Sequence, residues 1–208
     1  MRTRDRRRTG VTALLLAVGL ASAALLQGCN AIEPTPDHMK PPPGHGPFTG
    51  TVADWPLWFA WHQFGTHCFS VQRCKIIYAG RPHRVDRPRP TFDSLGRPVE
   101  KVLRAGRGPI KNFPAPAEVT WVSQDGTPLT ASIDMAEIFA DRMVRHTAAR
   151  EDILEDSNIP YPGIILVVDD RTISVYMSTW MALKMPKNPD SPHSDQHSGV
   201  VLVDSRTY

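Results

Sequence analysis

The sequence predicts an α+β, β-rich domain, mainly an antiparallel sheet or sandwich with one or two short helices packed on it. Three observations lead to this fold class. Apolar residues alternate with polar ones, or run together, in short segments of the kind that form strands. Proline accounts for 20 of the 208 residues, which disfavours long helices. Apolar residues recur at helical spacing only over short stretches.

The N-terminus has the pattern of a bacterial lipoprotein signal peptide. Five arginines precede an apolar run over residues 11–26, and Gln27 and Gly28 lead to Cys29. A common secretory signal has the same charged start and apolar centre, but here a cysteine stands where the mature chain would begin. The apolar run is shorter than the roughly 20 residues that span a bilayer. We therefore expect cleavage before Cys29, rather than an uncleaved membrane helix or a plain signal cut elsewhere.

Cys29 is the predicted lipidation site. Its thiol would carry a diacylglycerol and its amine a third acyl chain. Two or more chains anchor a protein stably, because each buried CH₂ contributes about 0.8 kcal/mol. Asn30 follows the cysteine, where an Asp would favour retention in the inner membrane. We therefore expect a lipid anchor in the outer membrane and a domain that faces the periplasm.

Charge and length set bounds on the mature protein. Residues 1–28 hold five Arg and one Asp, so 19 of the 24 basic and 20 of the 21 acidic side chains remain after cleavage. This nearly neutral balance does not favour nucleic acid as a partner. The length allows one domain. We predict a lipidated, proline-rich tether over residues 29–50, in an extended polyproline conformation, and a single globular periplasmic domain over residues 51–208.

Cys68 and Cys74 are the other two cysteines. The periplasm permits a disulfide. Residues six apart in a straight strand lie about 20 Å from each other, whereas a disulfide needs Cα atoms about 4.4–6.8 Å apart. A bridge therefore requires residues 69–73 to turn, and no Gly or Pro lies there to favour a turn. The sequence leaves a disulfide and two buried thiols as alternatives.

The domain is expected to start near residues 52–55. Trp55, Trp58 and Trp61 recur at every third position. Such a cluster is typical of a first core strand; the alternative is a platform for carbohydrate or lipid. A second strand is predicted over residues 68–78, where β-branched and aromatic residues precede a glycine.

Residues 81–116 have a different character. Nine basic residues stand against three acidic ones, with seven prolines among them, which predicts a long basic loop with one short strand near residues 99–103. The loop is interpreted either as solvated and mobile or as a contact surface for an acidic partner or anionic head groups. The candidate partner-binding residues are Arg81, Arg84, Arg87, Arg89, Arg104 and Arg107, together with Trp58 and Trp61.

The second half of the chain has clearer periodicity. A helix is predicted over residues 135–146, with Asp134 as its N-cap, and a short one over residues 149–156. Residues 134–170 hold nine Asp or Glu against three Arg, which allows the two charged segments to face one another. Strands are predicted over residues 117–123, 128–133, 163–168, 172–177 and 199–203, with turns at 124–126 and 169–171.

No residue pattern predicts catalysis. The chain has no G-x-S-x-G, no phosphate-binding glycine loop and no H-E-x-x-H. His193, Asp195 and His197 have metal-like spacing, but their serine-rich surroundings favour a polar loop. Asp169 and Asp170 are interpreted as turn residues rather than as a catalytic pair. We therefore expect a protein that is not an enzyme and holds neither a metal nor a cofactor.

Two strands, together with the N-terminal region, carry a resemblance to a known family. The signal peptide and proline-rich tether are followed by V-T-W-V-S at 119–123, a short helix and I-S-V-Y-M at 173–177. This succession resembles small bacterial lipoproteins encoded beside type VI secretion phospholipase effectors. The resemblance implies an immunity protein, a non-catalytic binding module that blocks a cognate secreted lipase at the membrane. The alternative is a structural or assembly lipoprotein of the outer membrane or cell wall.

Overall fold

The computed structural model describes residues 35–191 and 194–208. Cys29, the predicted signal peptide and residues 29–34 of the predicted tether lie outside the described residues. Within the described part, no helix has the length and apolar character needed to cross a membrane.

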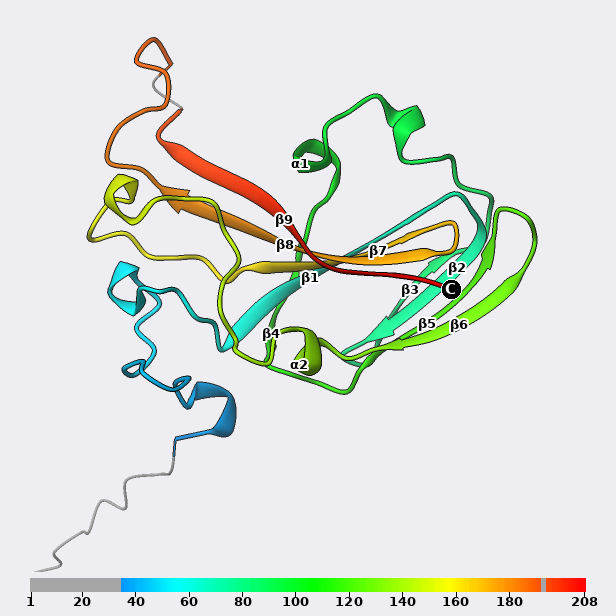
Figure 1. Cartoon of the computed structure of the whole chain (residues 1–208), viewed down its shortest axis with the longest axis horizontal. Coiled ribbons are helices and arrows are strands. Elements are labelled where there is room, and N and C mark those ends of the chain that lie inside the picture. The colour runs from blue at the N-terminus through cyan, green and yellow to red at the C-terminus, as the bar shows by residue number, and fades with distance from the viewer. Residues whose placement is uncertain (1–34, 192–193) are drawn as a thin grey trace, which may run out of the picture. The chain divides into compact units, whose positions relative to one another are not determined.

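The described residues form nine strands and two one-turn α-helices (Figure 1). The β-rich α+β prediction is thereby confirmed. The strands are β1 Trp61–Phe69, β2 Val71–Tyr78, β3 Arg81–Val85, β4 Arg107–Lys111, β5 Ala117–Ser123, β6 Pro128–Ile133, β7 Gly163–Asp169, β8 Thr172–Ala182 and β9 Gln196–Thr207, and the helices are α1 Val99–Val102 and α2 Met135–Ile138.

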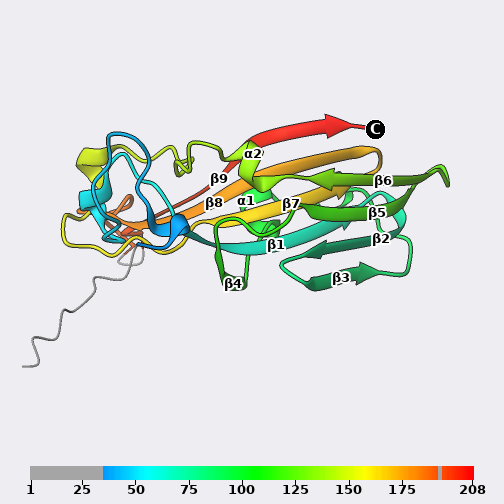
Figure 2. The same ribbon diagram turned by 90° about the horizontal axis from the view of Figure 1, so that it is seen from below.

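The strands make two sheets that share one core (Figure 2). The larger sheet has the order β4-β1-β7-β8-β9 and the smaller one β3-β2-β5-β6. β1 and β7 run parallel, and the other pairs are antiparallel. Phe64 and Ile164 of the larger sheet and Trp121 of the smaller one are fully buried between them. Each large apolar side chain buried in this way contributes about 1.5–3 kcal/mol.

A second, smaller core lies on the outer face of the larger sheet. Phe69, Ile165 and Val167 belong to it, and Leu103 covers them from the segment that follows α1. Figure 1 shows α1 lying beside this sheet. β7 is therefore covered on both faces, which explains why its residues are almost all apolar.

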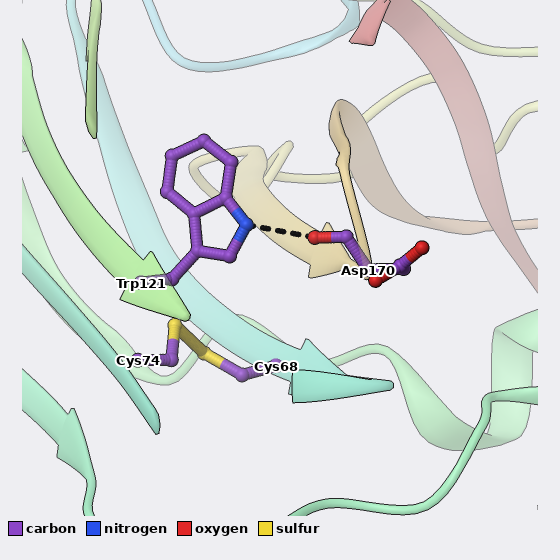
Figure 3. Close-up of a disulfide and its surroundings, with 4 residues drawn as sticks. All are labelled: Cys68, Cys74, Trp121 and Asp170. Atoms are coloured by element: carbon purple, nitrogen blue, oxygen red, sulfur yellow. Dashed lines mark hydrogen bonds between the residues drawn. A yellow bond between two sulfur atoms is a disulfide. The ribbon is translucent and has the colours of Figure 1, made fainter. Parts of the chain in front are cut away.

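The predicted strand over residues 68–78 is interrupted. Ser70 has a φ of 49° and reverses the chain between β1 and β2. The reversal places the Cα atoms of Cys68 and Cys74 6.5 Å apart, and a disulfide joins them (Figure 3). Because β1 belongs to the larger sheet and β2 to the smaller one, the disulfide links the two sheets. Nearby, the Trp121 indole Nε1 donates to the Asp170 carbonyl oxygen at 2.7 Å, again from one sheet to the other.

The first strand begins later than predicted. Val52–Asp54 form a 3-10 helix, whose first turn is capped by the Thr51 side chain. Pro56 then disfavours a strand, because it cannot donate a backbone hydrogen bond. β1 starts only at Trp61. The three tryptophans therefore do not share one face of a strand.

Residues 35–50 pack on the domain, so the predicted tether does not extend to residue 50. Pro42 is buried. The Arg142 guanidinium donates to the backbone carbonyl oxygens of His38 and Lys40 at 3.3 and 2.5 Å. A proline-rich segment offers many carbonyl acceptors and few N–H donors, so a guanidinium is well suited to hold it. Residues 35–50 accordingly belong to the same compact unit as residues 51–208.

The predicted loop over residues 81–116 contains β3 and β4 at its two ends. The β2–β3 turn has a positive φ at both Ala79 and Gly80, 50° and 68°, as tight hairpins require. Pro82 and Pro109 are tolerated within these strands because both strands lie at sheet edges. The rest of the segment, residues 86–106 and 112–116, contains no strand. Within it, α1 replaces the strand predicted at 99–103, because its apolar residues pack onto the outer core.

The two predicted helices are shorter than expected. Asp134 caps α2 as predicted, but the helix over residues 135–146 ends after one turn. Phe139 is fully buried, and Arg142, with a φ of 55°, turns the chain towards the core. The helix predicted over residues 149–156 is a single 3-10 turn, Arg150–Asp152. The residues that follow this turn pair with the end of β8 instead.

β8 and β9 extend beyond their predicted ends. β8 continues to Ala182, and β9 begins at Gln196 rather than at residue 199. Polar side chains such as those of Ser178 and Ser198 alternate with inward-facing residues here. This polarity concealed both extensions in the sequence.

Candidate functional site

The six candidate arginines lie on β3, on the loop that follows it and around the start of β4. Arg107 donates through Nη1 to the Arg81 carbonyl oxygen at 3.5 Å. β3 and β4 are edge strands of different sheets, so this contact joins the two sheet edges. We call the set the arginine surface: Arg81, Arg84, Arg87, Arg89, Arg104 and Arg107.

Two histidines lie within the arginine surface. Burial lowers the pKa of His83, and the positive charges of Arg107 and Arg89 lower it further. The pKa of His67 is also lowered, first by burial and then by His83 and Arg89, against a hydrogen bond with the backbone of Arg104. Arg89 of the loop and Arg107 of β4 therefore act on the imidazole of His83, and Arg89 also acts on that of His67. Because both imidazoles favour the neutral form, the arginines supply the positive charge of this surface.

Three members of the arginine surface line one hollow. Arg84, Arg87 and Arg89 line a hollow of about 360 Å³ together with Val85 and Asp86, so three guanidiniums stand against one carboxylate there. Arg84 faces away from the core beside Lys75 of β2, and the other two follow on the loop. A planar guanidinium can form two parallel hydrogen bonds with a carboxylate. Several of them around one hollow favour an acidic ligand.

The guanidiniums of the arginine surface are not paired with carboxylates in the described part of the chain. Among residues 35–191 and 194–208, none of its six arginines forms an ion pair. The acidic segment pairs elsewhere, for example Asp141 with Arg145 and Glu155 with Arg150 and Lys184. The charged segments 81–116 and 134–170 therefore do not neutralise each other through ion pairs.

The two candidate tryptophans have different environments. Trp58 is only 3% exposed. The Phe48 ring packs edge-on against it at 5.0 Å, and the Arg142 guanidinium lies 5.5 Å from its centre. The prediction that Trp58 binds a partner is wrong, because core packing covers it. Trp61 is half-buried, and its ring lies 6.4 Å from that of Tyr161.

A groove that the sequence did not indicate adjoins Trp61 on the outer face of the larger sheet. It has a volume of about 240 Å³. Tyr161 and Trp180 line it, each 40% exposed. Its residues come from parts of the chain that are far apart in the sequence, so no local motif predicts it. We call it the aromatic groove: Gln63, Glu100, Leu103, Arg104, Ala105, Pro160, Tyr161, Gly163, Ser178, Thr179, Trp180, Ser198, Gly199 and Val200.

A buried chain of polar side chains was also missed. The Tyr78 hydroxyl lies 3.0 Å from His62 Nε2, and His62 Nδ1 lies 2.6 Å from Asn112 Oδ1. Burial lowers the pKa of His62 to about 4, against the Asn112 hydrogen bond, which raises it, and burial raises the pKa of Tyr78. His62 has no solvent exposure, so this chain of hydrogen bonds holds the core together rather than meeting a substrate.

The residues with metal-like spacing are only partly described. His193 lies outside the described residues. Asp195 precedes β9, and His197 lies on that strand, where its Nε2 is 3.3 Å from the Thr147 hydroxyl. In the part of the chain that the structure describes, no group of three or more His, Cys, Asp or Glu side chains is arranged to hold a metal.

No protein-family model, curated protein or solved structure matches this chain. The geometry of the described domain leaves two surfaces as candidates for binding. One is the arginine surface, whose residues were predicted from composition, and the other is the aromatic groove.

Proposed function

We propose that this protein is a membrane-anchored periplasmic lipoprotein that acts as a non-catalytic binding module. Its partner is a secreted lipase effector of the type VI secretion system, and it acts as the immunity protein that inhibits this lipase. The observation that supports binding is the arginine surface, whose guanidiniums have no carboxylate partner in the described residues. The class of the partner rests on the sequence resemblance and on the lipid anchor predicted at Cys29.

The arginine surface has the properties of a protein-binding site. Arg81, Arg84 and Arg107 stand on strands, and side chains on regular elements are held more precisely than those on loops. The backbone N–H of Arg104 donates to His67 Nε2 at 3.2 Å, which fixes the loop against β1. Arginines are over-represented among the few residues that dominate binding energy. An acidic patch on the lipase would be attracted over a distance and then bound by these guanidiniums.

The predicted lipid anchor would place the inhibitor where a lipase acts. Both the toxin and the anchored domain would then be confined to one membrane surface, which raises their effective concentration. Binding over about 800 Å² on each partner is typical of specific inhibitors. A module of this kind protects by covering the lipase and needs no chemistry of its own.

Partner capture tests this proposal. The full-length lipoprotein with a C-terminal tag is purified in detergent from envelopes of cells that also make their secreted effectors, and the proteins that co-elute are identified by mass spectrometry. We expect a secreted lipase at about one-to-one stoichiometry. Recovery of outer-membrane or cell-wall components without any lipase would contradict the proposal and favour the structural or assembly role.

A further inference from the structure

The aromatic groove is formed before any ligand arrives. The Trp180 indole Nε1 donates to Gln196 Oε1 at 2.9 Å across the β8–β9 pair, which fixes the plane of the ring. The Tyr161 ring lies against Trp61, and the Lys111 ammonium lies 5.5 Å from the centre of that indole. Two partly exposed rings are therefore held in place from behind. A preformed site loses less conformational entropy when it binds.

The wall and floor of the groove are fixed by close backbone packing. Gly65 leaves no room for a Cβ against the Arg104 carbonyl oxygen, and Gly163 leaves none between Ser178 and Ala105. The backbone N–H of Gly106 donates to the Phe64 carbonyl oxygen at 3.3 Å. The segment that forms the wall is thus tightly packed against β1 and β7.

The groove presents donors and acceptors that the described domain does not use. No described residue forms a hydrogen bond with the side chains of Gln63, Glu100 or Ser198. The Arg104 guanidinium donates to two backbone carbonyl oxygens, those of Glu100 at 2.6 Å and Leu103 at 3.4 Å. The lining contains one carboxylate, that of Glu100, and one guanidinium, that of Arg104, so the lining as a whole is close to neutral.

We propose that the aromatic groove binds an uncharged glycan chain. A sugar ring has an apolar face of C–H groups, which packs on an aromatic ring, and hydroxyl groups at its edge that bond to amide, carboxylate and guanidinium groups. The volume of about 240 Å³ is below the roughly 300–1,000 Å³ of pockets that enclose a whole small ligand. The groove accordingly covers a short stretch of a longer chain.

A glycan fits the groove better than an extended peptide or a phospholipid head group. The floor is made by β7 and β8, whose backbones are paired on both sides within the sheet. A peptide therefore cannot bind there by adding a strand, which is the usual source of affinity for extended peptides. A charged head group would need an excess of cations, and the groove has one guanidinium balanced by one carboxylate. This binding goes beyond the proposed inhibition of a lipase and rests on an adjoining surface that shares only Arg104 with the arginine surface.

Titration with a defined sugar tests the inference. The full-length lipoprotein in a sugar-free polyoxyethylene detergent is titrated calorimetrically with the β-1,4-linked tetramer of N-acetylglucosamine. We expect saturable one-to-one binding and a blue shift of tryptophan fluorescence, because the ligand would cover Trp180. Trp180→Ala should weaken binding at least tenfold, and Glu100→Gln, which removes a carboxylate acceptor without changing shape, should weaken it several-fold.

Matched variants distinguish this inference from the proposed function. Leu202→Ala removes an exposed side chain of the same sheet outside the groove (52% exposed), and it should leave sugar affinity unchanged. Arg81→Glu with Arg107→Glu should strongly weaken lipase binding and leave sugar affinity unchanged. Absence of saturable binding at millimolar tetramer, or equal affinity in Trp180→Ala with an unchanged melting temperature, would overturn the inference and leave the lipase proposal intact.

Discussion

His62 illustrates how a single residue determines the chemistry of the core. Its ring is fully buried, yet both nitrogens have partners: Nδ1–H donates to Asn112 Oδ1, and Nε2 accepts from the Tyr78 hydroxyl. Asn112 Nδ2 in turn donates to the Phe59 carbonyl oxygen at 2.8 Å. All of these groups are satisfied only while the imidazole is neutral. Protonation would place a charge between the sheets with no carboxylate bonded to it.

Stability is therefore expected to fall in mild acid. The pKa of His62 is about 4 in the folded protein and about 6.5 when unfolded. Between these values the unfolded chain binds more protons, so the free energy of unfolding falls as the pH drops from about 6.5 towards 4. Above this window His62 makes the free energy of unfolding no more dependent on pH. We expect a loss of about 2 kcal/mol between pH 7 and pH 5. Urea unfolding at both pH values measures it.

The variant His62→Gln provides the comparison for the acid effect. Other histidines with lowered pKa, such as His67 and His83, contribute in both proteins. The informative quantity is the difference between the two pH dependences. The wild type should lose more stability than the variant, and equal losses would show that His62 does not titrate in this window.

Charge reversal at two arginines tests their role in binding. In Arg81→Glu with Arg107→Glu, two carboxylates replace the guanidiniums of two residues whose contact joins the edges of β3 and β4. Association with the lipase should weaken by roughly a hundredfold or more, since one arginine hot spot contributes about 2 kcal/mol or more. Biosensor binding of the tagged lipoprotein to the captured lipase measures the change.

The control for charge reversal lies in the same loop. Arg97 and Lys101 are exposed and belong to the same basic segment, but lie outside the arginine surface. The double variant Arg97→Glu with Lys101→Glu changes the net charge equally and should retain binding. Equal losses in the two double variants would show that net charge, rather than the arginine surface, determines association.

At the scale of elements, the sequence predicted strands correctly where each strand pairs with the next one along the chain. The strands at 117–123 and 128–133 and the hairpin at 163–177 follow from alternation and turn residues, and each pairs with its neighbour in sequence. The parallel pair β1–β7 joins segments nearly a hundred residues apart, so no local pattern predicts it. β3 and β4 were missed because basic residues and prolines, unusual in strands, are tolerated only at sheet edges.

The disulfide between β1 and β2 has a direct effect on the free energy of unfolding. It closes a short loop around Ser70 and links the two sheets. Replacing both cysteines, as Cys68→Ala with Cys74→Ala, should lower the free energy of unfolding by about 2 kcal/mol on the chain-entropy estimate for so short a loop. Urea unfolding measures this difference. A single variant, Ser70→Gly, retains the bridge and relieves the positive φ, so it should not destabilise the domain.

The candidate site was predictable in part for the same reasons. Arginine content singled out the basic segment, and six of its residues form the arginine surface. Trp58 was misassigned because the burial of an indole depends on Phe48 and Arg142, which are distant contacts. The aromatic groove combines β1, β7, β8 and β9 with α1 and two loops, and only the folded sheet brings these together.

At the scale of the whole molecule, two chemically different surfaces adjoin on one domain. Arg104 belongs to both the arginine surface and the aromatic groove. In the proposed arrangement, the arginine surface meets a soluble enzyme and the groove meets a glycan. With the anchor predicted at Cys29, the domain would be held between the membrane and the cell wall, where a lipase toxin must pass.

Inhibition of the partner lipase is the most direct test of the central claim. The captured lipase hydrolyses phospholipid vesicles while full-length lipoprotein is added in increasing ratio, and fatty-acid release is followed. We predict complete inhibition at one equivalent, retained by the Arg97→Glu and Lys101→Glu variant and lost with Arg81→Glu and Arg107→Glu. Undiminished hydrolysis at a several-fold excess of the wild-type lipoprotein would contradict its assignment as an immunity protein.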